Sequence, residues 1–148
     1  MTSSRFVVAV HILTLLETNG GEPVTSDHVA RSVRTNPGVI RRLVSKLHRA
    51  GLVTSRLGAG GGTVLARPAD QIRLADVYHA VEAKTLFTMH YSAPSPVCPV
   101  GKHIQAALSP YLRRAEQALK GELGVVTLAD VVRSVGEEAL SQHAAARR

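Results

Sequence analysis

Apolar residues recur at helical spacing in the first part of the chain. The first run, over residues 5–18, has an apolar side made of Phe6, Val10, Leu13 and Leu16. Ser3 or Ser4 can cap this helix, and Gly20 ends it. A shorter second helix follows Thr25 or Ser26, and its apolar positions are Val29, Ala30 and Val33. The pattern therefore predicts two helices that are followed by a turn at "RTNP".

A third helix, over residues 37–50, has the clearest boundaries. Asn36 is a good N-cap, Pro37 suits the first helical position and Gly51 suits the stop. At about 100° per residue, one side of this helix is apolar and consists of Ile40, Leu43, Val44 and Leu47. The other side carries small residues and cations, namely Gly38, Arg41, Arg42, Ser45, Lys46 and Arg49. One side can therefore enter a core while the other faces outward.

Glycines crowd the segment "RLGAGGGTVL", residues 56–65. Residues 53–56 and 63–65 predict two short strands, and the glycines predict the turn of a hairpin between them. A phosphate-binding loop is the alternative, but no Gly-Lys pair follows Gly58 and Thr63 stands where G-x-G-x-x-G needs its third glycine. Phosphate loops also lead into a helix, whereas these glycines lead into "TVLARP".

The middle of the chain predicts one more helix and an irregular segment. Residues 73–82 are amphipathic at helical spacing. Residues 88–101 are expected to be irregular, because they contain three prolines: Pro94, Pro96 and Pro99.

The last third predicts two helices. Apolar residues repeat at helical spacing over residues 102–122, where Pro110 either kinks the helix or divides it. Thr127 and Asp130 form a capping box before a final helix, and the tail 141–148 is expected to fray. The predicted fold class is mainly α with one small β-hairpin.

Positive charge is concentrated in one stretch. The formal net charge is +7. No acidic residue lies between Asp27 and Asp70, and that interval contains Arg31, Arg34, Arg41, Arg42, Lys46, Arg49, Arg56 and Arg67. A solvated face normally mixes both signs, so this stretch favours a polyanionic partner, although composition alone also allows a merely soluble basic protein.

The cysteine count and the N-terminus bear on location. One cysteine, Cys98, excludes an internal disulfide and fits a reducing compartment. The apolar run "RFVVAVHILTLL" resembles a signal peptide, but Glu17, Thr18 and Asn19 follow it in place of a small-x-small cleavage site. The run is also shorter than the roughly 20 residues that span a bilayer. We expect a cytoplasmic protein with no membrane partner.

Taken together, the short helix, the basic helix and the hairpin form the winged helix-turn-helix arrangement. In this arrangement the second helix of the turn enters the major groove of double-stranded DNA and the hairpin, or wing, lies near the adjacent backbone or minor groove. Arg56 at the base of the wing is placed to reach phosphate or the narrow groove. The residues expected to contact DNA are Ser26, Thr35, Asn36, Pro37, Gly38, Arg41, Arg42, Ser45, Lys46, Arg49, Arg56, Gly58, Gly60 and Gly61.

Several motifs in this order resemble the Rrf2 family of bacterial winged-helix transcription regulators, to which IscR, NsrR and CymR belong. The shared pieces are "AGLV" (50–53), "GG" (61–62), "LARP" (65–68), "LADV" (74–77), "AVE" (80–82) and the stretch at 126–131. The resemblance implies a homodimer on a palindromic operator, in which a long C-terminal helix of each chain crosses the other. Residues implied to lie in that dimer contact are Ile104, Leu108, Tyr111, Leu112, Ala115 and Leu119.

The resemblance also implies a division of the chain. A winged helix-turn-helix DNA-binding domain is expected over residues 1–84, followed by a Pro-rich loop over 85–101. Dimerisation helices are expected over 102–140, with the frayed tail after them. Members of the family that hold an iron–sulfur cluster have three cysteines in the loop before the long helix, and this chain has only Cys98 there. We therefore expect the cluster-free branch, similar to YwnA or CymR, with no cofactor.

Two interpretations of Cys98 are open. It is either a small thiol without a role or a redox sensor whose pKa is lowered by Lys102, His103 and the start of the long helix. The set His90, Cys98 and His103 matches no common closed zinc pattern, so no metal site is expected.

The main functional hypothesis is a sequence-specific regulator, most simply a repressor. The alternative is a winged-helix module that contacts an acidic protein in a regulatory complex. An enzyme is not expected, because the sequence has no paired carboxylates or His/Cys/Asp constellation; His11 and His79 lie on apolar helix sides and are expected in a core or interface. The sequence identifies no small-molecule effector.

Overall fold

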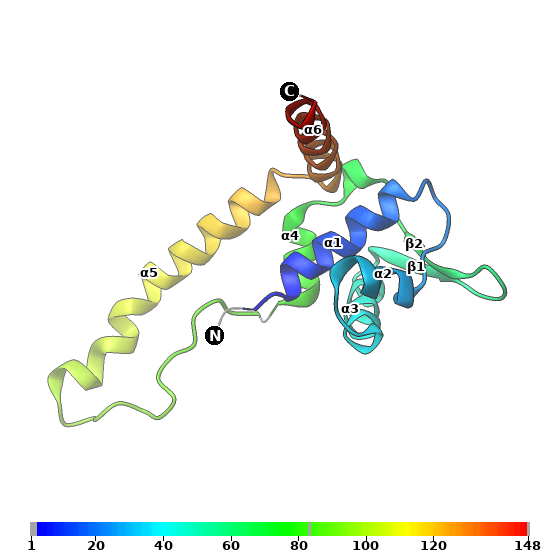
Figure 1. Ribbon diagram of the computed structural model, residues 1–148. Coiled ribbons are helices and arrows are strands. Elements are labelled where there is room, and N and C mark those ends of the chain that lie inside the picture. The colour runs from blue at the N-terminus through cyan, green and yellow to red at the C-terminus, as the bar shows by residue number, and fades with distance from the viewer. Residues whose placement is uncertain (1–2, 83, 148) are drawn as a thin grey trace.

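Helices dominate the structure, and a single hairpin accompanies them. The computed structural model describes residues 3–82 and 84–147. Its elements are α1 (Arg5–Thr18), α2 (Ser26–Val33), α3 (Pro37–Arg49), β1 (Val53–Arg56), β2 (Gly62–Leu65), the 3-10 turn η1 (Ala69–Gln71), α4 (Leu74–Val81), α5 (Pro99–Gly124) and α6 (Leu128–Ala146). Figure 1 shows the head formed by α1 to α4 and the hairpin, with α5 extending away from it. The predicted class, mainly α with a small hairpin, is confirmed.

The boundaries of α2 and α3 follow from local chemistry. Thr25 caps α2, since its hydroxyl accepts a hydrogen bond of 3.2 Å from the amide of His28. Asn36 caps α3 in the same way, at 3.0 Å from the amide of Val39. Pro37 occupies the first turn, and Gly51 takes a left-handed φ of 74° after the last turn. These predictions are confirmed.

The core of the head is aliphatic and lies between α1, α3, α4 and the base of the hairpin. Its fully buried members include Ala9, Ile12, Leu13, Ile40, Leu47, Leu52, Val77 and Leu128. The prediction for the apolar side of α1 is partly wrong, because Phe6 and Val10 are only half-buried while Ala9 and Ile12 are fully buried. The side that faces the core is therefore rotated from the predicted one.

The hairpin is antiparallel, and its register pairs Val53 with Leu65 and Arg56 with Gly62. Its base is anchored to the chain just before α2. Val24 and Thr63 exchange two backbone hydrogen bonds, with N···O distances of 3.0 and 2.9 Å. The second strand of the hairpin is thus held beside the start of α2.

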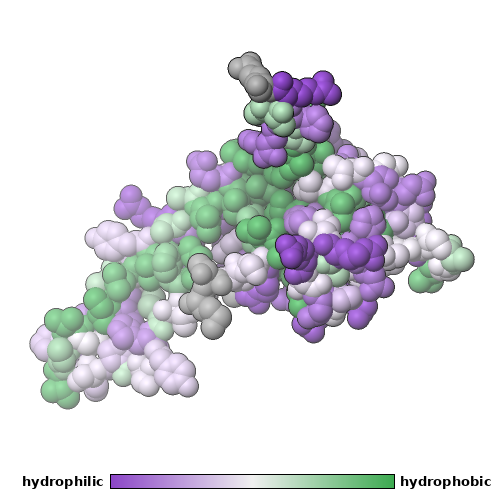
Figure 2. Space-filling model, in the orientation of Figure 1, coloured by the Kyte–Doolittle hydropathy of each residue, from purple (hydrophilic) through white to green (hydrophobic). Residues whose placement is uncertain are grey.

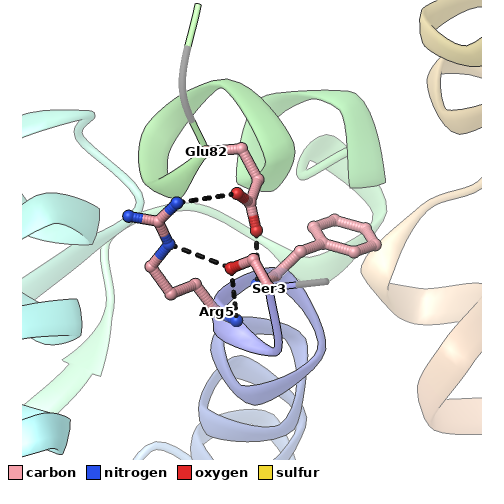
Figure 3. Close-up of polar contacts among 4 residues, drawn as sticks. Ser3, Arg5 and Glu82 are labelled. Carbon is pink, nitrogen blue, oxygen red and sulfur yellow. Dashed lines mark hydrogen bonds and ion pairs between the residues drawn. The ribbon is translucent and has the colours of Figure 1, made fainter. Parts of the chain in front are cut away.

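The start of α1 is joined to the end of α4 through polar contacts (Figure 3). Glu82 accepts hydrogen bonds from the amide of Phe6 at 3.1 Å and from the guanidinium of Arg5 at 3.2 Å. The hydroxyl of Ser3 accepts from the backbone amide and from Nε of Arg5. Ser4 precedes α1 and its carbonyl oxygen accepts from the amide of Val8 at 2.9 Å, but Ser3 is the serine whose side chain contacts the first turn of α1.

The C-terminal end of α5 and the link that follows it are hydrogen-bonded to the head. The amide of Leu74 donates to the carbonyl oxygen of Val126 at 2.9 Å, and the amide of Leu128 donates to that of Ile72 at 2.8 Å. The guanidinium of Arg73 donates to the carbonyl oxygen of Gly124 at 2.6 Å. The short link between α5 and α6 is therefore bonded to the segment that precedes α4.

The capping box at the start of α6 is confirmed. The amide of Asp130 donates to the Thr127 hydroxyl at 3.1 Å, and the amide of Thr127 donates to the Asp130 carboxylate at 2.9 Å. The Thr127 amide, followed by the side chains of Arg133 and Thr127, lowers the pKa of the Asp130 carboxyl.

In the C-terminal half, the start of α5 and the extent of α6 differ from the prediction, and one of the two alternatives for Pro110 is wrong. Helix α5 starts at Pro99, inside the segment expected to be irregular, because proline is accepted in the first turn of a helix. Pro110 lies inside one continuous helix and does not divide it. The tail expected to fray over 141–148 is helical to Ala146, and Arg148 lies outside the described residues. None of the helices in the described ranges is long and apolar enough to cross a membrane.

Candidate nucleic-acid interface

Helix α3 presents its cationic side to solvent. Arg41, Arg42, Ser45 and Arg49 are exposed and Lys46 is half-buried, whereas Ile40, Leu43 and Leu47 are buried in the core. The core contacts of α3 thus determine which side faces outward. Within the described residues, the ion pairs join Arg5 to Glu82 and Arg133 to Asp130, and neither involves α3. The cations of α3 are therefore available to an external anion.

The turn before α3 places further residues that are predicted to contact DNA next to the cationic side of α3. Arg34 ends α2 in the left-handed conformation, with φ of 64°, which directs the chain sharply into α3. Asn36 is exposed, and the remaining predicted residues of this region are half-buried: Ser26, Thr35, Pro37 and Gly38. A Cβ atom at Gly38 would lie 3.1 Å from Oδ1 of Asn36, so glycine at this position leaves room for the Asn36 side chain that caps α3.

The wing is exposed, and its tip does not pack inward. Arg56, Gly58 and Gly60 are exposed, and Gly61 is half-buried. Leu57, which the sequence did not single out, is 94% exposed at the tip. At the base, a Cβ atom on Gly62 would lie 2.6 Å from the carbonyl oxygen of Val24, so only glycine permits the close approach that anchors β2.

The predicted dimer residues lie along α5, and no residue of α5 is buried. Leu108 is 40% exposed and Tyr111 is 66% exposed. Ala115 is exposed, and Ile104, Leu112 and Leu119 are half-buried. Figure 2 shows hydrophobic residues along much of this helix. Within its own chain, α5 therefore leaves an apolar side uncovered.

Cys98 is exposed and is the residue just before α5. Hydrogen bonds from the backbone of Gly101 and then Val100 lower the pKa of its thiol. Of the causes expected from sequence, the start of the long helix is the one that lowers this pKa, and Lys102 and His103 are not among the causes. A reactive thiolate is thus favoured by the start of the helix itself.

The histidines show no catalytic arrangement in the described residues. His11 and His79 are exposed, so the expectation of a core position is wrong, while the alternative of an interface stays a prediction. His11 lies 2.9 Å from the hydroxyl of Ser32, and His90 lies 3.4 Å from the side-chain amide of Gln105.

No three His, Cys, Asp or Glu side chains in residues 3–82 and 84–147 gather as metal ligands. An iron–sulfur cluster is normally held by four ligands, mostly thiolates. The chain has one cysteine, Cys98, so its residues do not fit such a cluster. We derive no function through iron.

Comparison with known proteins gives consistent matches. The family model Rrf2, described as an iron-dependent transcriptional regulator, matches residues 2–134. The chain is 43% identical to the HTH-type transcriptional regulator YwnA of Bacillus subtilis (strain 168) over 133 residues, which are 89% of this chain and 97% of YwnA. It is 39% identical to the regulator IscR of Cereibacter sphaeroides over 93 residues, 62% of this chain and 59% of IscR.

A solved structure agrees with these matches. CymR, the global cysteine regulator of B. subtilis, superimposes with a TM-score of 0.68 at 25% identity, covering 90% of this chain and 97% of CymR. The family match spans most of the chain, and the resemblance drawn from the sequence motifs is confirmed. The protein belongs to the Rrf2 family of transcriptional regulators.

Proposed function

We propose that this chain is a sequence-specific DNA-binding repressor that binds a palindromic operator as a homodimer. The observation that carries the proposal is the outward side of α3, which is cationic, exposed and without a carboxylate partner in the described residues. Membership of a family of transcriptional regulators supports it. The electrostatic attraction to phosphate supplies most non-specific affinity, and base contacts add the specificity.

Helix α3 would lie in the major groove, which is about 12 Å wide and admits a helix. Asn36, Arg41, Arg42 and Ser45 would contact base edges, because they lie at the start and on the outward side of α3. Lys46 and Arg49, one turn further on, would bind phosphates. Ser26, Thr35, Pro37 and Gly38 surround the start of α3 and would approach the adjacent backbone.

The wing would contact DNA beside the major groove. Its base is held against Val24 by two hydrogen bonds, while Arg56 at the end of β1 is exposed. Gly58 and Gly60 take left-handed φ values of 91° and 75°, and together with Gly61 they leave the tip without bulky side chains beyond Leu57. Backbone amides can therefore approach phosphate closely.

The homodimer would form through the apolar side of α5. Six residues share that side: Ile104, Leu108, Tyr111, Leu112, Ala115 and Leu119. A helix whose apolar side is uncovered in its own chain requires a second surface, and pairing of two copies satisfies both chains at once. Two heads related by a two-fold axis read two equal half-sites, so the operator would be palindromic.

Selection of bound duplexes from a random pool tests the proposal. We expect enrichment of one palindrome and an affinity that falls steeply as salt rises. A winged-helix module that contacts an acidic protein would enrich no palindrome and would show flat salt dependence on DNA. That result would contradict the proposal and favour the alternative.

A redox response through Cys98 is the second part of the proposal, and the exposed thiol with its lowered pKa supports it. With hydrogen peroxide as the oxidant, two Cys98 thiols would form a disulfide. They would release two protons and two electrons, which reduce one peroxide to two waters. Alternatively, one Cys98 thiol and one small thiol would form a mixed disulfide, and they would release the same two protons and two electrons to peroxide. Either disulfide would change the spacing of the two heads.

We expect peroxide to weaken DNA binding of the wild-type protein several-fold and to leave Cys98→Ser unchanged. Because the pKa of the thiol is lowered, alkylation by iodoacetamide should reach its half-maximal rate at a lower pH than for a free cysteine. Gel-shift affinities of reduced, oxidised and substituted protein provide the measurement. Equal affinity in all three would assign Cys98 no regulatory role.

A further inference from the structure

Helix α3 has two flanks, and each is formed by different elements. On one flank lie the wing and the start of α2, which are joined where Val24 pairs with Thr63. On the other lie α4 and the start of α1, which are joined by the contacts of Arg5 and Glu82 (Figure 3). In Figure 1 the wing and α4 lie on opposite sides of α3. The second flank has received no function so far.

Two clefts on this second flank are lined by cations, and both include Lys46. One, of about 350 Å³, lies between α1 and α3 and is lined by Ser4, Arg5, Arg42 and Lys46 over an apolar floor. The other, of about 330 Å³, lies between α3 and α4 and is lined by Lys46, Arg49 and His79 with two alanines. Lys46 therefore connects the clefts along the flank.

In the described part of the chain, no carboxylate is among the lining residues of either cleft, and two carboxylates of the neighbouring elements, Glu82 and Asp76, already accept hydrogen bonds. Glu82 is only 12% exposed at its side chain, and it accepts from both Arg5 and the amide of Phe6. Asp76, in the first turn of α4, accepts from the amide of Arg73. The polar side chains that line the two clefts are thus hydrogen-bond donors and cations, which suit a row of anions.

We propose that this flank binds DNA backbone phosphates, with His79 of α4 as a contact. The inference rests on the proposed function. A helix in the major groove has a phosphate backbone on each side of it. The wing, with Arg56, faces one backbone, and the two clefts face the other. The alanines beside His79 leave the second cleft open, so a phosphate can approach Lys46, Arg49 and His79 together.

Charge reversal at His79 tests the inference, with His143 as the matched control. His143 is exposed near the end of α6, away from α3 (Figure 1), so the same substitution there changes the net charge equally without touching the flank. At about 0.1 M salt we expect His79→Glu to weaken duplex binding about tenfold, and His79→Lys to strengthen it about fivefold with a salt slope steeper by about 1. The His143 variants should change affinity less than twofold.

Ethylation interference locates the contact on the DNA. We expect modification of one or two phosphates flanking each half-site to weaken wild-type binding and to have no further effect on His79→Glu. Because His79→Lys is expected to gain affinity, misfolding cannot imitate the result. If His79 and His143 variants behave alike on a duplex that the wild type binds, the inference is wrong and the proposed function stands. If the wild type binds no duplex, the proposed function itself fails.

Discussion

Replacing Arg41 and Arg42 together by alanine is expected to lower operator affinity by about 100-fold or more. Both side chains are exposed on the outward side of α3, and no ion pair within the described residues holds either one. A bidentate arginine contact to guanine discriminates by about 1–3 kcal/mol, so two of them account for a loss of this size. Because base contacts are removed, the ratio of specific to non-specific affinity should fall as well.

Fluorescence anisotropy with the selected operator and with a scrambled duplex measures both quantities. Arg113→Ala with Arg114→Ala is the matched control, since this adjacent pair is also exposed, lies on α5 and carries the same charge. The control should lose affinity equally for both duplexes and only slightly. An operator preference that survives in the α3 double variant would mean that α3 does not read the bases.

Replacing Leu108 and Leu112 together by aspartate is expected to convert the dimer to a monomer and to lower operator affinity by 100-fold or more. Leu108 is 40% exposed and Leu112 is half-buried, so neither supports the core of its own chain. Two charges placed in an apolar contact between chains would be left without partners. Once the heads are separate, the gain from binding two half-sites at once, about 10²–10⁴-fold, is lost.

Analytical ultracentrifugation gives the mass, and binding to a single half-site shows whether the head remains intact. Gln117→Asp is the control, because Gln117 is exposed on the opposite side of α5. It should stay dimeric with normal affinity. If the Leu108/Leu112 variant sediments like the wild type, α5 is not the contact between the two chains.

Local signals made α3 and the hairpin predictable from sequence. Asn36, Pro37 and Gly51 each act through neighbouring backbone groups, and the glycines at 58 and 60–62 match a hairpin that needs left-handed or crowded positions. The outward side of α3 was also predictable, because the apolar and the cationic residues of this helix lie on opposite sides of the helix axis.

Tertiary packing determines the features that the sequence pattern did not predict, such as the buried side of α1 and the exposure of His79. Helix α1 is apolar on nearly all sides, so the pattern favoured Phe6 and Val10, whereas packing against α3 and α4 buried Ala9 and Ile12. The three prolines near residue 96 indicated an irregular segment, yet Pro99 starts α5. Exposure of His79 and the clefts beside it depend on where α4 lies against α3, which no local pattern reveals.

Three hydrogen bonds join the segment before α4 to the C-terminal end of α5 and its link to α6: Arg73 donates to Gly124, Leu74 donates to Val126, and Leu128 donates to Ile72. The long helix leaves the head through the segment after Glu82 and is fastened to it again beside η1 and α4. Because α5 is bonded to the head at its C-terminal end, its angle to the head does not depend on the length of the segment over residues 84–97. In the proposed homodimer, residues 84–97 could therefore become longer or shorter during evolution without changing the separation of the two heads.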